Sequence, residues 1–263
     1  MRPYLAIVSA GVRVMLQYRA AAAAGFATQL FWGWIRVAIF GAFYASSSAT
    51  QPMSLEDTIS YLWLTQALLL LLPFRLDSDL VAMIRDGTVA YELTRPADLY
   101  WYWFSRTLAS RTAPMLLRAG PLLLVSGLFF GLAAPDSLSA LAAFLVSVGA
   151  ALLLSSAFTM LMSISLLWTI AGDGISRLIS MIAQFLSGSY VPLPLFPQWA
   201  QPALALLPFA GLTDTPFRLY LGHLPLSSFP TAIAHQLLWT AVLVLVGRLA
   251  LARGLRRMVV QGG

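Results

Sequence analysis

Six stretches of the chain are apolar over nearly the length that a helix needs to cross a bilayer, which is about 20 residues. They lie at about 20–44, 58–74, 113–134, 138–170, 175–191 and 230–252. Only 10 % of the residues are charged and 59 % are hydrophobic, whereas a soluble domain has about 25 % charged residues. The chain is therefore predicted to be an all-α polytopic membrane protein with six transmembrane helices in a single domain, residues 1–263.

The basic residues predict how these helices are oriented. All sixteen are arginines, and with the N-terminus inside, all but Arg36 and Arg218 fall on the cytoplasmic side. Because cytoplasmic loops are enriched in basic residues, both termini are predicted to be cytoplasmic, in the cytoplasmic (inner) membrane of a bacterium. This distribution explains the net charge of +6 without nucleic-acid binding, since no basic run belongs to a soluble fold.

The N-terminal segment is too polar to span a bilayer. Leu5, Val8 and Val12 recur at helical spacing, while the arginines lie off this stripe. This pattern is typical of a helix that lies in the membrane interface, here residues 1–19. The alternative is a cytoplasmic extension of the first transmembrane helix.

A charged segment, residues 75–106, joins the second and third apolar stretches on the cytoplasmic side. Asp77 or Ser78 is suited to cap a short helix, and Gly87 is suited to end it in a left-handed turn. Asp98 is placed to begin the next helix. This much local structure is not needed in a simple connection, because helix–helix connections are often only a few residues long.

The five aromatic residues at 100–104 are expected at the headgroup layer, where amphipathic rings gather. With the helix before them, they complete a short amphipathic cytoplasmic helix, a capped turn and a return into the membrane. The mixed charge of the helix favours a docking surface for a soluble partner. The alternative is a solvated interfacial helix that has no partner.

Two motifs in this chain resemble those of the ABC-2-type exporter permeases. The first reads I-R-x-G-x-x-x-x-x-L-x-R-P and is matched by Ile84, Arg85, Gly87, Leu93, Arg95 and Pro96. The second lies in the outer segment after the fifth apolar stretch and is matched by Ser187, Gly188, Pro192, Phe196, Pro197, Trp199, Leu207, Pro208 and Phe209. Six helices and two cytoplasmic termini agree with the same family, so the resemblance covers essentially the whole chain.

The resemblance implies the transmembrane subunit of an exporter that works by alternating access. In such proteins the first cytoplasmic loop is a coupling helix that fits a cleft on an ATP-binding subunit, present in two copies. A second permease subunit, identical or related, completes the pathway. The candidate coupling residues are Arg85, Asp86, Gly87, Glu92, Arg95 and Pro96, with Asp173 in the turn at 169–177 as a smaller second contact. That turn has an alternative interpretation as a simple connection.

The chain is not expected to hydrolyse ATP itself, and no cofactor is expected to bind to it. The phosphate-binding loop of such enzymes needs a lysine, and the sequence contains none. ATP and magnesium are therefore expected on the partner subunit. Because the spans lack the buried carboxylates of a cation route, the sequence favours a hydrophobic or amphipathic substrate such as a drug, a natural product or a lipid.

The outer segment, residues 190–230, contains eight prolines. Non-helical backbone at membrane depth must be buried or line a water-filled cavity, so short helices such as 198–207 are expected to re-enter the membrane as a gate. The alternative is an ordinary proline-rich loop. The gate or pathway candidates are Arg36, Ser189, Pro192, Pro194, Phe196, Pro197, Pro208 and Phe209.

Arg36 lies within the first predicted span. A charge at this depth is costly and marks a functional position by default. Its side chain is expected either to reach outward to the interface, or to line the pathway or pair with a partner subunit.

Two other functions remain open from the sequence. A channel or structural membrane subunit would have no ATPase partner. An intramembrane serine protease would use Ser189 and His235, although the expected G-x-S-G pattern is not met.

Overall fold

The computed structural model describes residues 2–15, 19–74, 76–94, 97–168 and 173–256, and within these ranges all regular secondary structure is helical. The four longest helices are α2 (Arg19–Ser46), α6 (Leu99–Phe129), α7 (Leu138–Ser165) and α11 (Phe229–Leu255). The shorter α-helices are α1 (Arg2–Met15), α3 (Leu55–Ala67), α4 (Ser78–Arg85), α5 (Val89–Glu92), α8 (Asp173–Leu186), α9 (Gln201–Leu206) and α10 (Asp214–Tyr220). Single 3₁₀ turns are η1 (Leu69–Leu71), η2 (Leu193–Leu195), η3 (Ala210–Leu212) and η4 (Leu226–Ser228).

Four helical segments in the described chain are long and apolar enough to cross a membrane: Ala22–Ser46, Leu99–Phe129, Leu138–Ser165 and Leu226–Leu255. This confirms a polytopic α-helical membrane protein. The predicted spans at 58–74 and 175–191 correspond to the shorter helices α3, with 13 residues, and α8, with 14 residues. Both fall short of the roughly 20 residues of a full crossing.

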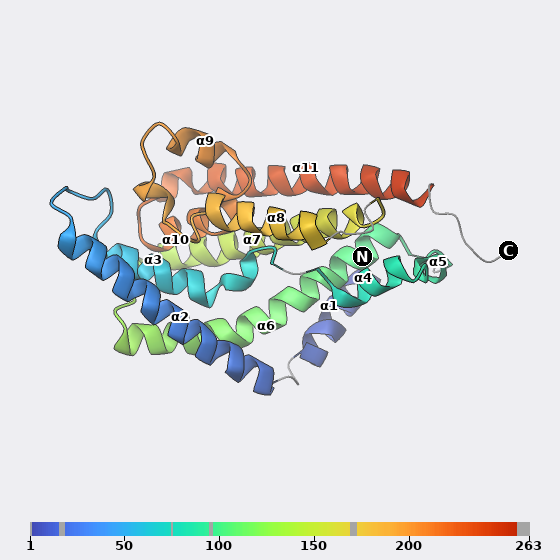
Figure 1. Ribbon diagram of the computed structural model, residues 1–263, viewed down its shortest axis with the longest axis horizontal. Coiled ribbons are helices and arrows are strands. Elements are labelled where there is room, and N and C mark those ends of the chain that lie inside the picture. The colour runs from blue at the N-terminus through green and yellow to red at the C-terminus, as the bar shows by residue number, and fades with distance from the viewer. Residues whose placement is uncertain (1, 16–18, 75, 95–96, 169–172, 257–263) are drawn as a thin grey trace.

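The helices define two ends of the molecule (Figure 1). The α4–α5 end also contains α1 and the C-terminal turns of α11, and the α9–α10 end contains the connection from α2 to α3. Helices α7 and α11 run side by side, whereas α2 and α6 cross obliquely beneath them. Helix α1 packs across α6, where the Tyr4 hydroxyl accepts a hydrogen bond of 3.2 Å from the backbone N–H of Asp98.

Helix α3 is enclosed by its neighbours, because almost every residue from Thr58 to Ala67 is buried. Its Tyr61 and Trp63 are fully buried in a core cluster with Leu122 of α6 and Phe217 of α10. The short second stretch is therefore a central packing helix.

The predicted start of a helix at Asp98 is confirmed, and this helix continues into the third apolar stretch, which begins at about residue 113. Helix α6 begins at Leu99, where the Asp98 carboxylate accepts the backbone N–H of Trp101 at 3.0 Å. Tyr100 and Trp103 are only 2 % and 1 % exposed, so these two rings of the aromatic run pack in the core of the protein. Arg106, Arg111 and Arg118, which the orientation argument assigns to the cytoplasmic side, are all helical positions of α6.

We expect Gly33→Ala to destabilise the fold where α2 crosses α3. A Cβ atom at Gly33 would lie 2.3 Å from Trp63 Cζ3, and Trp63 is held by a hydrogen bond of 2.9 Å from its Nε1 to the Phe130 carbonyl. Overpacking of this kind typically costs about 1–3 kcal/mol. Thermal unfolding in lipid nanodiscs, followed by tryptophan fluorescence, measures the effect.

The matched control is Gly41→Ala in the same helix, where no atom lies within 4 Å of the added Cβ. It should leave the melting temperature unchanged or slightly raised, because alanine favours a helix over glycine. Equal destabilisation by both substitutions would contradict the packing of α2 on Trp63.

Candidate functional site

Helix α4 begins and ends at the residues that its sequence predicts. The Asp77 carboxylate accepts the backbone N–H groups of Asp79 and Leu80 at 3.0 and 3.3 Å, which confirms an N-cap at this position. Leu80 is 2 % exposed and holds the helix against the bundle. Gly87 follows the helix with φ of +72°, a conformation that glycine adopts at no steric cost.

Charged and apolar side chains are exposed together at this end of the molecule. Arg85 and Asp86 are exposed at the end of α4, and Tyr91 and Leu93, just beyond, are 76 % and 51 % exposed. We call these four residues the α4–α5 surface. The sequence-predicted Glu92 differs, because it is only 8 % exposed and so lies behind this surface.

Ion pairs fasten the α4–α5 end to the long helices. Arg106 of α6 lies 3.2 Å from Asp79 and 3.5 Å from Asp77, at the start of α4. Asp98, which caps α6, lies 2.9 Å from Arg248 of α11. These ion pairs link the start of α4 to α6, and the start of α6 to the end of α11.

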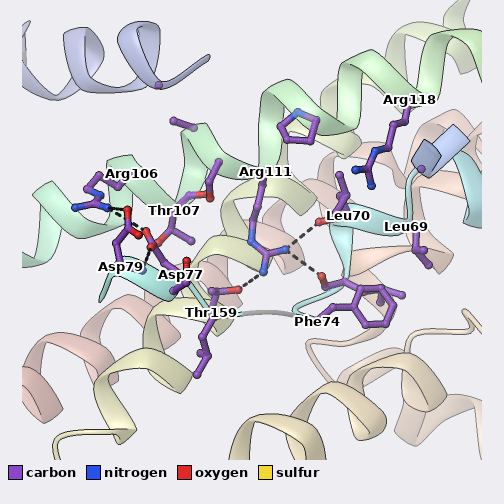
Figure 2. A pocket seen from close by; sticks show the side chains of 18 of the residues that line it. Leu69, Leu70, Phe74, Asp77, Asp79, Arg106, Thr107, Arg111, Arg118 and Thr159 are labelled. Carbon is purple, nitrogen blue, oxygen red and sulfur yellow. Dashed lines mark hydrogen bonds and ion pairs between the residues drawn. The ribbon is translucent and has the colours of Figure 1, made fainter. Parts of the chain in front are cut away.

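Arg111 donates hydrogen bonds to backbone carbonyls just after the end of α3. After Ala67 the chain makes one 3₁₀ turn and then runs extended, so its carbonyls leave the helical pattern. Arg111 Nη1 donates to the Leu70 and Leu72 carbonyls at 2.9 and 3.0 Å. Ser155 and Thr159 of α7 accept from the same guanidinium (Figure 2). A buried cation is thus stabilised by backbone dipoles and hydroxyls, at the C-terminal side of a helix where positive charge is favoured.

A cavity of about 1190 Å³ lies beside Arg111. Its walls come from α1, α2, α6, α7 and the connection between α3 and α4. Its charged residues are the aspartates Asp77 and Asp79 and the arginines Arg106, Arg111 and Arg118. Figure 2 shows Arg111 and Arg118 on the same side of α6.

A second polar cluster is buried at the α9–α10 end. Tyr61 donates to Asp214 at 3.1 Å, and Arg218 lies 3.5 Å from the other carboxylate oxygen. Burial raises the pKa of the Asp214 carboxyl to about 6, although Arg218 and the Tyr61 hydrogen bond act in the opposite direction. Gly188, with φ of +88°, leaves room for the Tyr61 hydroxyl, which would lie 2.4 Å from an added Cβ. The Ser-Gly motif after α8 therefore fits this packing.

Arg36 and Ser189, two gate candidates, lie together in the structure. Arg36 Nη1 donates to the Ser189 carbonyl at 2.7 Å, and its guanidinium lies 5.5 Å from the centre of the Tyr190 ring. Arg36 of α2 thus binds a backbone carbonyl in the non-helical connection after α8. Arg111 binds backbone carbonyls in the connection after α3 in the same way.

The serine protease interpretation gains no support from this geometry. Ser189 is 2 % exposed, and no hydrogen bond between Ser189 and His235 is found in the part of the chain that the structure describes. The ring of His235 is instead placed with Nε2 at 3.1 Å from the Leu206 carbonyl.

The remaining gate candidates are spread along the outer segment. Pro192 and Pro208 are buried, Pro194 is half-buried and Pro197 is exposed. Two candidates make ring contacts, Phe196 with Phe185 at 5.5 Å and Phe209 with Phe158 at 5.3 Å. The expected short helix at 198–207 is α9, Gln201–Leu206.

Among the coupling candidates, Arg95 and Pro96 lie outside the described residues. Asp173 is the first residue of α8, and its side chain is likewise outside the described part. The residues that sequence reasoning missed are Gln29, Arg111, Arg118 and Asp214. For Arg111 and Arg118 the available signal is a spacing of seven residues, which places both on one face of a helix.

Comparison with known proteins gives one family. A family model described as ABC-2 family transporter protein matches residues 30–262, which is nearly the whole chain. No curated protein matches the sequence.

We expect Arg111→Leu to destabilise the protein strongly. The substitution leaves the Leu70 and Leu72 carbonyls without this donor, and each unsatisfied buried group costs about 1–3 kcal/mol. Arg111→Lys should be intermediate, because a single ammonium keeps the charge but lacks the planar fork. Thermal unfolding in nanodiscs measures both.

The control is Arg253→Leu, which removes the same charge from an exposed position of α11. It should leave the melting temperature nearly unchanged. If Arg111→Leu were as stable as this control, Arg111 would not be what holds the break after α3.

Proposed function

Because the chain belongs to the ABC-2 family of transporters, we propose that it is the transmembrane subunit of an exporter driven by a separate ATP-binding subunit. The family implies such a partner. The observation that carries the proposal is the α4–α5 surface, where Tyr91 and Leu93 are exposed beside Arg85 and Asp86. Exposed aromatic residues near mixed charge are typical of protein interfaces.

In this proposal the α4–α5 surface is the coupling element. Two ATP-binding subunits close on ATP and magnesium, and each presses on the permease it contacts. The ion pairs of Arg106 with Asp77 and Asp79 carry that movement to α6. The pair between Asp98 and Arg248 carries it on to α11.

The same proposal covers the pathway and its setting. A second permease subunit, identical or related, completes an alternating-access pathway for a hydrophobic or amphipathic substrate. The complex lies in the cytoplasmic membrane of a bacterium, with both termini and the α4–α5 end in the cytoplasm and the α9–α10 end outside as the gate. The arginine distribution supports this orientation.

We expect a tagged copy of the chain, purified from native membranes in mild detergent, to retain an ATP-binding subunit identified by mass spectrometry. Tyr91→Ala combined with Leu93→Ala should reduce its recovery about tenfold, since truncating interface anchors typically costs more than about 1.4 kcal/mol. The double substitution Arg85→Ala and Asp86→Ala should also reduce recovery of the ATP-binding subunit, because it removes contacts of the same surface.

The control is Trp199→Ala, which removes a side chain that is 84 % exposed but lies in the outer segment, before α9. Its ATPase recovery should match that of the unaltered chain. Recovery of the unaltered chain without any ATP-binding subunit in several detergents would refute the exporter and favour a channel or structural subunit.

A further inference from the structure

A second arginine of α6 faces the cavity at greater depth than Arg111. Arg118 lies eleven residues before the helix end at Phe129, which is roughly 16 Å along the helix axis at 1.5 Å per residue. That is about half the thickness of a bilayer core. With Thr107, Arg111 and Pro114 it forms one stripe along the cavity wall.

The Arg118 guanidinium has no partner in the described part of the chain. Its Nε is buried and has no acceptor, and no interaction reaches it in Figure 2. Arg106 is paired with two carboxylates and Arg111 has four acceptors. A charge at membrane depth is normally paired, so Arg118 lacks a counter-group that its position demands.

Gln29 of α2 lines the same cavity and is also unsatisfied. It is only 5 % exposed, and its Oε1 is buried without a donor. One turn earlier in α2, a Cβ on Gly25 would lie 2.5 Å from Arg118 Cζ. Glycine therefore allows the guanidinium to lie directly against the backbone of α2, next to Gln29.

The cavity accommodates more than a small ion. Its volume of about 1190 Å³ exceeds the range of roughly 300–1,000 Å³ usual for ligand pockets. Apolar side chains that include Ile7, Leu69 and Phe74 line it. Its two carboxylates are both held by Arg106, so neither neutralises the arginines deeper in the cavity.

We propose that this cavity binds an anionic amphiphile whose phosphate group pairs with Arg118. A hydroxyl of the head group donates to Gln29, and the apolar part of the molecule lies along the apolar wall. A guanidinium suits this role because its planar donors match phosphate oxygens. The site belongs to the permease chain itself. The proposal is the same for a molecule that is transported and for one that stays bound.

The test is a titration of the full-length, delipidated chain in neutral detergent, monitored by native mass spectrometry. The probes are dioleoylphosphatidylglycerol, dioleoylphosphatidylcholine and inorganic phosphate. Phosphatidylglycerol should bind more tightly than phosphatidylcholine, and Arg118→Gln should weaken it about tenfold or more, because hydrogen bonds to charged groups contribute about 1.5–3 kcal/mol.

Two further variants keep the result interpretable. Arg253→Gln removes the same charge at an exposed site outside the cavity and should bind phosphatidylglycerol like the unaltered chain. Gln29→Leu keeps the charge of Arg118 and should weaken phosphatidylglycerol severalfold, which preserves the test if Arg118→Gln does not fold.

Competition with inorganic phosphate shows whether the site takes free phosphate or only the phosphate group of a lipid. If it competes with phosphatidylglycerol in the unaltered chain and not in Arg118→Gln, the site takes free phosphate as well as lipid. If it does not compete, the acyl chains are required. Equal phosphatidylglycerol affinity in the unaltered chain, Arg118→Gln and Gln29→Leu would overturn the proposal. Because no ATP-binding subunit is present, this failure is separate from failure of the exporter assignment.

Discussion

The hydrogen bonds of Arg111 are the interaction on which the membrane-embedded part of the protein depends. Helix α3 stops before it can cross a bilayer, and the carbonyls of its non-helical continuation need hydrogen-bond partners other than the helix. One guanidinium bridges the Leu70 and Leu72 carbonyls, and the Ser180 hydroxyl donates to the Pro73 carbonyl at 2.6 Å. The break is thus completed by α6 and α8, which in turn fixes where these helices lie.

Helix α6 connects this buried break to the end of the molecule proposed to meet the ATPase. Its cap at Asp98 binds Arg248 of α11, its Arg106 binds the start of α4, and its Arg111 holds the end of α3. These contacts lie along the N-terminal half of one continuous helix. In the proposed coupling, a push on α4 would therefore reach α6 through side-chain contacts.

Hydropathy and local capping residues predicted much of this architecture. They did not predict which charged side chains are buried inside the helix bundle. The caps at Asp77 and Asp98 and the turn at Gly87 depend on neighbouring residues alone, so the sequence determines them. The position of Arg111 inside α6 is different, because its buried charge is acceptable only through acceptors on the α3–α4 connection and α7. A hydropathy window treats such a residue as solvated and begins the apolar span only after it.

The same reasoning separates the candidate site into predictable and unpredictable parts. Arg36 and Ser189 were each suggestive in the sequence, but their contact joins residues that are 153 positions apart. The Asp214 cluster likewise needs Tyr61 from a distant helix. Such pairings follow from how α2, α3 and the outer segment pack, and no local pattern encodes them.

The three arginines assigned to membrane depth differ in the acceptors that surround them, and this difference explains why Arg118 needs a partner. Arg36 and Arg111 both donate to carbonyls at points where the chain leaves a helix, so backbone dipoles replace the water that each guanidinium has lost. Arg118 faces the uninterrupted helix α2 at Gly25, where the carbonyls are already engaged by helical hydrogen bonds. Because the carbonyls of α2 at this point offer no free acceptor, our proposal assigns the counter-charge to a molecule that enters the cavity.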